Sequence, residues 1–82
     1  MTISAQVAIY PLRQEHLGPA IRAVTAALTD RGLTPETGPM STTVTGDADP
    51  VFAALRDAFV AATATGEVVM TVTVSNACPV RR

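Results

Sequence analysis

Two side-chain amides and a phenol are the groups in this chain best suited to bind a small heteroaromatic molecule. Gln6 lies within a run of alternating apolar and polar residues that Tyr10 ends, and Asn76 follows a second such run. An amide offers two donors and an acceptor, and a tyrosine offers an aromatic face beside a hydroxyl. These groups suit a ligand with adjacent donors and acceptors, such as an aminopyrimidine. Structural roles are open as well: Gln6 can instead hydrogen-bond a threonine on a neighbouring strand, and Asn76 can cap a turn.

The other reactive side chains do not form a catalytic or metal-binding pattern. Cys78 is the only cysteine, which excludes disulfide frameworks and multi-thiolate metal sites, and no basic residue shortly before it could activate its thiol. His16 is the only histidine, and the seven acidic residues are scattered without a pair spaced for acid–base catalysis. On apolar grounds alone, Met40 would fill a gap in the core. The sequence therefore predicts neither an enzyme nor a metal or cofactor site.

Size and charge narrow the classes of protein further. The chain has 82 residues, enough for a single domain over residues 1–82. Its net charge of −1 offers no basic surface for a nucleic-acid backbone. Its longest apolar stretches are too short to cross a bilayer, and the lone cysteine fits a reducing compartment. We therefore expect a cytoplasmic protein that binds neither nucleic acid nor membrane.

Two helical segments separate the alternating runs. Apolar residues recur at helical spacing from residue 17 to residue 28 and Gly32 follows as a left-handed stop, which predicts a helix over residues 16–31. Asp49 as an N-cap before Pro50 predicts a second helix over residues 50–64. Its expected buried stripe consists of Phe52, Leu55, Phe59 and Ala62. Strands are predicted over residues 3–10, 34–39 (an edge strand), 41–46 and 68–75.

The order strand, helix, strand, strand, helix, strand predicts an α+β fold of the ferredoxin-like type. Right-handed crossovers place both helices on one face of a four-stranded antiparallel sheet, with the first and third strands central. The other face is small, polar and uncharged: it carries Ser4, Gln6, Ala8, Tyr10, Thr71, Thr73 and Ser75. Solvated sheet faces normally carry charged residues, so we expect this face to be covered by a second subunit, by a ligand or by both.

Three segments resemble the YkoF-type thiamine/hydroxymethylpyrimidine-binding family in their order and spacing. They are residues 6–12 (QVAIYPL), 38–42 (GPMST) and 75–78 (SNAC), and the resemblance runs nearly the whole length of the chain. It implies a ferredoxin-like single domain without catalysis that forms a homo-oligomer, a dimer or a tetramer. It also implies a ligand pocket formed by Gln6, Tyr10, Met40, Ser41, Thr42 and Asn76, with Ser4 and Cys78 as further candidates.

Two functions follow from these observations. The resemblance implies non-catalytic binding of thiamine or of its hydroxymethylpyrimidine part, as a carrier, a sensor or an accessory of salvage. The alternative is a regulatory or structural interaction module that oligomerises through its sheet and binds no thiamine. Tyr10 offers an aromatic face to the thiazolium cation of thiamine, and none of the three segments holds an acid for it.

Overall fold

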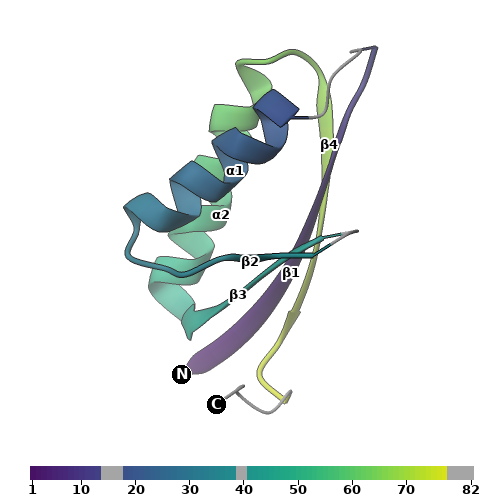
Figure 1. The fold of residues 1–82 in the computed structure, drawn as a ribbon. Helices are drawn as coiled ribbons and strands as arrows, with labels where there is room; N and C mark the ends of the chain where they lie inside the picture. Colours follow the sequence, from purple (N-terminus) through teal and green to yellow (C-terminus); the bar gives the residue numbers. More distant parts are fainter. Residues whose placement is uncertain (14–17, 39–40, 78–82) are drawn as a thin grey trace.

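Strands and helices alternate in the order βαββαβ (Figure 1). The computed structural model describes residues 1–13, 18–38 and 41–77. Its elements are β1 (Thr2–Pro11), α1 (Gly18–Asp30), β2 (Glu36–Thr37), β3 (Thr42–Asp47), α2 (Ala48–Thr63) and β4 (Val68–Ser75). The strands form one antiparallel sheet in the order β2-β3-β1-β4, and both helices cover one face of it (Figure 1). The predicted ferredoxin-like α+β fold, with the first and third strands central, is confirmed.

The alternation along β1 separates a buried face of the sheet from an outer one. Ile3, Ala5 and Val7 are 4%, 1% and 2% exposed and pack beneath the helices together with Val44. Directly paired residues share a face, so the strand registers also define the outer face. It carries Ser4, Gln6 and Ala8 of β1, Thr43 and Thr45 of β3, and Thr71, Thr73 and Ser75 of β4. The predicted assignment of the two faces is confirmed.

The first helix follows the sequence prediction closely. Within the described residues α1 begins at Gly18, and Pro19 occupies the first turn, where a missing N–H costs no helical hydrogen bond. Gly32 has a φ of +78°, the left-handed conformation that glycine adopts without strain, and it ends the helix as predicted. His16 and Leu17, where the helix was predicted to begin, lie outside the described residues. The buried residues of α1 are Ala20, Val24, Ala27 and Leu28.

The N-terminus of α2 differs from the prediction. The N-cap is Asp47, not Asp49, and its side chain makes no capping hydrogen bond. The main-chain N–H of Ala48 donates to the carbonyl of Met1 at 2.9 Å and is satisfied in that way. Asp49 lies in the first turn, where its negative charge favours the helix dipole. The helix can begin before Pro50 because a residue in the first turn does not need its N–H for a helical hydrogen bond.

The buried stripe of α2 also differs from the prediction. It consists of Val51, Ala54, Leu55, Ala58 and Ala62. Phe52 and Phe59, which were predicted to be buried, are 52% and 41% exposed. Each phenylalanine lies one position past a buried residue, which turns its side chain by about 100° around the helix. Alanines at the contact let α2 approach the sheet and α1 more closely than phenylalanines would allow.

The predicted edge strand is confirmed, but β2 spans only Glu36–Thr37. Pro35 precedes it and has no N–H to extend the pairing. The hairpin that joins β2 to β3 is closed by the N–H of Gly38, which donates to the carbonyl of Ser41 at 2.8 Å. The edge of the sheet on this side is therefore short.

The β2–β3 hairpin flanks only the first part of β1. The pairing of β1 with β3 ends at Val7 and Thr42, whereas the pairing of β1 with β4 continues to Pro11 and Val68. Figure 1 shows β1 and β4 running on beyond the hairpin. In the described part of the chain, residues 8–11 of β1 therefore have a partner strand on one side only.

Candidate functional site

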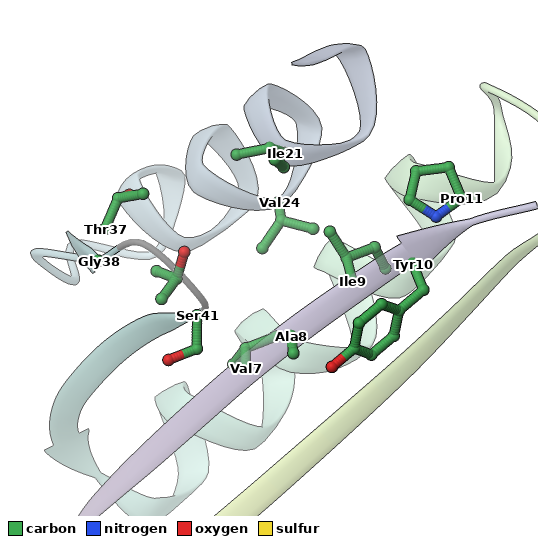
Figure 2. Close-up of a pocket in the computed structure, with 11 residues that line it drawn as sticks. Val7, Ala8, Ile9, Tyr10, Pro11, Ile21, Val24, Thr37, Gly38 and Ser41 are labelled. Carbon is green, nitrogen blue, oxygen red and sulfur yellow. The ribbon is translucent and has the colours of Figure 1, made fainter. Parts of the chain in front are cut away.

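A cavity of about 300 Å³ lies where the hairpin stops alongside β1 (Figure 2). It is formed by β1, α1 and the two ends of the hairpin. Its lining residues are Val7, Ala8, Ile9, Tyr10 and Pro11 of β1, Ile21 and Val24 of α1, and Thr37, Gly38, Ser41 and Thr42. Volumes of this order are at the lower end for small-molecule sites, which are typically apolar with a few polar groups.

The cavity follows the open edge of β1 rather than either face of the sheet. Val7 and Ile9 belong to the helix-covered face, whereas Ala8 and Tyr10 belong to the outer face. A cavity lined by both pairs must lie beside the strand, in the position that a longer β3 would occupy. Figure 2 shows α1 on one side of this space and the hairpin residues at one end of it.

Hydroxyl groups supply the polarity of the cavity. Thr37, Ser41 and Thr42 line it from the hairpin, and Tyr10 lines it from β1. Thr42 is 6% exposed and is the only buried polar residue among those described. No described residue hydrogen-bonds the Thr42 hydroxyl, and no fully buried side-chain N or O atom of the described residues lacks a partner. The hydroxyl is therefore not fully buried, and the space that Thr42 lines is the cavity. A ligand there would meet an unused donor and acceptor.

A hydrogen bond joins two of the predicted site residues. The Nε2 of Gln6 donates to the Oγ of Ser41 at 3.1 Å. Gln6 lies on the outer face and does not line the cavity itself, whereas Ser41 does. The partner of Gln6 is thus a serine at the end of the hairpin rather than a threonine within β3. The bond positions the Ser41 hydroxyl and leaves its proton available to a ligand.

Three of the predicted residues line the cavity, and two others cannot be placed. Tyr10, Ser41 and Thr42 come from strand and hairpin positions that the sheet brings side by side. Met40 and Cys78 lie outside the described residues.

Ser4 and Asn76 lie at the other end of the sheet. The Ser4 hydroxyl hydrogen-bonds the Oγ1 of Thr45 at 3.2 Å, and the Nδ2 of Asn76 lies 3.7 Å from the Sδ of Met1. Asn76 directly follows the residue that pairs with Ser4. The strand rises about 3.3 Å per residue, so Ser4 is about 13 Å from Ala8, the nearest lining residue on the same face. Neither side chain reaches the cavity of its own chain.

The helix α1 contributes lining residues that the sequence pattern assigns to the core. Ile21 is half-buried, and Val24 is 2% exposed. Figure 2 shows the Val24 side chain directed toward β1. An apolar stripe at helical spacing has the same pattern whether it packs against a sheet or borders a cavity. The sequence therefore held no signal that separates these two residues from ordinary core.

The ion pairs found among the described residues involve none of the residues that line the cavity. Arg13 pairs with Glu67 beyond the end of β1. The Nε of Arg31 donates to the Oδ2 of Asp57 at 2.8 Å, and this bond, with help from Arg56, holds the pKa of Asp57 below its usual value. Across residues 1–13, 18–38 and 41–77, no group of three or more histidine, cysteine or acidic residues could hold a metal ion. Neither described helix combines the length and the apolar character needed to cross a bilayer.

Several solved structures share this fold. Protein SP2199 from Streptococcus pneumoniae is 25% identical with a TM-score of 0.82, over 92% of this chain and 86% of that one. The hypothetical protein MJ1052 from Methanocaldococcus jannaschii is 21% identical with a TM-score of 0.84, over 98% and 84% of the two chains. TM0486 from Thermotoga maritima, provisionally assigned to thiamine biosynthesis or salvage, is 16% identical with a TM-score of 0.79, over 90% and 82%.

The comparison with protein families is more specific than the comparison of folds. The sequence model of the thiamine-binding protein family matches residues 5–77, a range that contains every described residue lining the cavity. No functionally curated protein matches the chain. The family supports a role related to thiamine, and it confirms the resemblance carried by the three sequence segments. The chain belongs to the thiamine-binding protein family.

Proposed function

We propose that this protein binds thiamine, or the hydroxymethylpyrimidine part of thiamine, in the cavity beside β1 and without catalysing a reaction. The observation that carries the proposal is the position of the cavity, which lies between the strand and hairpin segments, residues 6–12 and 38–42, that resemble thiamine-binding proteins. The family match over residues 5–77 supports the same ligand. The protein acts as a carrier, a sensor or an accessory of salvage in the cytoplasm and needs no further cofactor. The salvage role is supported by the provisional assignment of TM0486.

The lining of the cavity suits a flat and partly polar ring. Ile21 and Val24 offer apolar contact on the side of α1 (Figure 2). Ser41 and Thr42 offer hydroxyls at the hairpin end. Tyr10 is 50% exposed on the outer side of β1, where its ring can contact the thiazolium cation in a cation–π interaction of about 0.5–2 kcal/mol.

Thermal unfolding with thiamine, hydroxymethylpyrimidine and the separate thiazole half tests the proposal. A ligand at 100 times its Kd stabilises the native state by about 2.7 kcal/mol. For a domain of this size, that raises the melting temperature by on the order of 10 °C or more. We expect thiamine and the pyrimidine to raise it and the thiazole half to raise it less. Absence of any shift at millimolar thiamine would reject the function.

A second candidate function rests on the sheet rather than on the cavity. The outer-face residues of β1 and β4 carry no charge, and β4 presents eight residues without a charged side chain at the edge of the sheet. Long uncharged edge strands normally pair with another chain unless they are protected. We therefore propose a homo-oligomer, a dimer or a tetramer, formed through this face or this edge. In the absence of thiamine binding, the same surfaces would make the protein an interaction module.

Analytical sedimentation tests the oligomer and separates its two possible surfaces. A Thr73→Lys variant places a charge in the middle of the outer face, while the main chain at the edge of β4 stays intact. We expect this variant to lose the oligomer if the face forms the contact and to keep it if the edge does. A wild-type monomer at micromolar concentration would exclude both.

A further inference from the structure

Main-chain groups of β1 face the cavity as well as side chains, and a hydrogen bond beyond the strand fixes their direction. The N–H of Leu12 donates to the carbonyl of Glu67 at 2.8 Å, one step past the pair formed by Pro11 and Val68. In an antiparallel sheet, successive residues of a strand bond alternately to one neighbour and to the other. The even-numbered residues of β1 therefore bond β4, and the odd-numbered residues direct their N–H and C=O toward β3.

The hairpin gives the same result independently. The N–H of Gly38 donates to the carbonyl of Ser41, one step past the pair formed by Thr37 and Thr42. Ser41 therefore bonds within the hairpin, and Thr42 directs its main chain toward β1. Thr42 stands opposite Val7, an odd-numbered residue. Val7 is therefore the last residue of β1 whose main chain hydrogen-bonds β3.

Ile9 is the next odd-numbered residue, and no described residue bonds its main chain from the β3 side. Its N–H and C=O are directed along the open edge, into the cavity that Ile9 lines. Pro11 follows on the same edge and has no N–H, so it adds only a carbonyl. The edge thus presents one donor followed by two acceptors to the cavity, and main-chain groups of this kind form hydrogen bonds wherever a partner is within reach.

We propose that the N–H and C=O of Ile9 bind the aminopyrimidine ring of the ligand by its edge. A ring nitrogen accepts from the N–H of Ile9, and the adjacent exocyclic amine donates to the C=O of Ile9. The ring then occupies the place that a further residue of β3 would take. This inference rests on the proposed function and names the chemical class that the site selects: flat rings with an amine next to a ring nitrogen.

The surroundings of this edge fit a ring that lies in the plane of the sheet. Ile21 and Val24 face it from α1, and Tyr10 lies on the opposite, outer side of β1 (Figure 2). The Thr42 hydroxyl opens to the cavity at the end where the pairing with β3 stops. A ring bound to Ile9 therefore has apolar contact on one face and a hydroxyl at one end. None of the described residues that line the cavity has an amide or a charged side chain. Recognition by the main chain accounts for this, because the main chain then supplies the donor and the acceptor.

Two thiamine analogues test the proposal by calorimetric titration of the full chain. Pyrithiamine keeps the aminopyrimidine and replaces only the thiazolium ring, so we expect it to bind as thiamine does. Oxythiamine has a carbonyl in place of the amine and an N–H in place of the ring nitrogen, which reverses donor and acceptor. We expect it to bind at least about tenfold more weakly, because both main-chain groups of Ile9 then face like groups. Equal binding of oxythiamine and thiamine overturns the role of Ile9, whereas failure of both thiamine and pyrithiamine to bind overturns the proposed function and this inference with it.

Hydrogen exchange of single amides gives a readout that depends on Ile9 itself. Saturation with thiamine should slow the exchange of the Ile9 amide by about tenfold or more, because the ligand becomes its acceptor. The amides of Ala8 and Tyr10 serve as matched controls, since they bond β4 with or without the ligand. Unchanged exchange at Ile9 in thiamine-saturated protein overturns the inference and leaves thiamine binding standing.

Discussion

The first part of β1, residues 2–7, and its second part, residues 8–11, carry the same alternation of side chains but have different neighbours. The first part pairs with β3 along its whole length, and from Ser4 onward it pairs with β4 as well. Its apolar residues Ile3 and Val7 are 4% and 2% exposed. The second part has β4 alone, Ile9 is half-buried, and Tyr10 is 50% exposed. Alternation along a strand therefore determines which face of the sheet a residue belongs to. The length of the neighbouring strand determines whether that residue becomes core or lines a site.

Truncation of one isoleucine in each part of β1 tests this comparison with the largest expected effect. Ile3→Ala should lower the free energy of unfolding by about 2–5 kcal/mol, because it leaves a cavity in a closed core. Ile9→Ala should lower it by less than about 2 kcal/mol, because Ile9 already borders a space. Denaturant unfolding measures both losses, and calorimetry should show weaker thiamine binding only for Ile9→Ala. Equal losses of stability with no change in binding would mean that the two parts do not differ.

Thr42 marks the boundary between the two parts, and removal of its hydroxyl should affect binding more than folding. Thr42→Val keeps the shape of the side chain and removes a hydroxyl at the cavity that no described residue hydrogen-bonds. We expect thiamine affinity to fall by about tenfold to hundredfold, since a ligand group would be left unpaired. The melting temperature without ligand should stay the same or rise. A loss of stability with unchanged affinity would place the hydroxyl in the fold and not in the site.

Gln6 and Ser4 lie on the same face of the first part of β1 and make a matched pair of variants. Gln6→Leu removes the donor to Ser41, and we expect a loss of affinity of about threefold to tenfold, because the Ser41 hydroxyl is no longer held in place. Ser4→Ala removes a similar bond, to Thr45, at the far end of the sheet and should leave the affinity unchanged. Titration of both variants with thiamine measures the difference. Equal effects would separate Gln6 from the site.

The smallest effect is expected from the ion pair between Arg31, which directly follows α1, and Asp57 of α2. This pair belongs to neither part of β1. The hydrogen bond from Arg31 lowers the pKa of Asp57 in the folded protein, so the charged carboxylate stabilises the fold at a pH above its usual value of 3.8. This contribution is lost as the pH falls through the lowered pKa of the folded state. Asp57→Asn should therefore lower the free energy of unfolding slightly at neutral pH, and should leave it unchanged at a pH below the lowered pKa. Thiamine affinity should not change. In a protein that already carries Arg31→Gln, the effect of Asp57→Asn on the free energy of unfolding should depend less on pH. If the pH dependence stays the same, a residue other than Arg31 is the partner of Asp57.

Regular patterns in the sequence predicted most of the fold, but they did not predict where the cavity lies. The period of two in β1 and β4 and the helical stripe of α1 predicted strands, faces and topology correctly, because burial of one face imposes these periods. The prediction was wrong for Phe52 and Phe59, because a pattern ranks residues by apolar character and cannot show that smaller alanines permit closer packing. The cavity itself depends on where β3 stops relative to β1, a property of two segments far apart in the sequence. Ser41 and Thr42 were found only through the family resemblance.

The short β2–β3 hairpin has a consequence for how such a site can change in size. Each residue pair added to the two strands of the hairpin would cover about 3.3 Å more of the edge of β1 and would keep the same register. Two further pairs would place a residue of β3 opposite Ile9 and replace the ligand by the chain's own main chain. Deletion of a pair would expose Val7 and lengthen the open edge. The length of the hairpin therefore determines how much of the edge of β1 stays open to a ligand. A longer hairpin would pair with the whole of β1 and close the site, while the helices and the core stay unchanged.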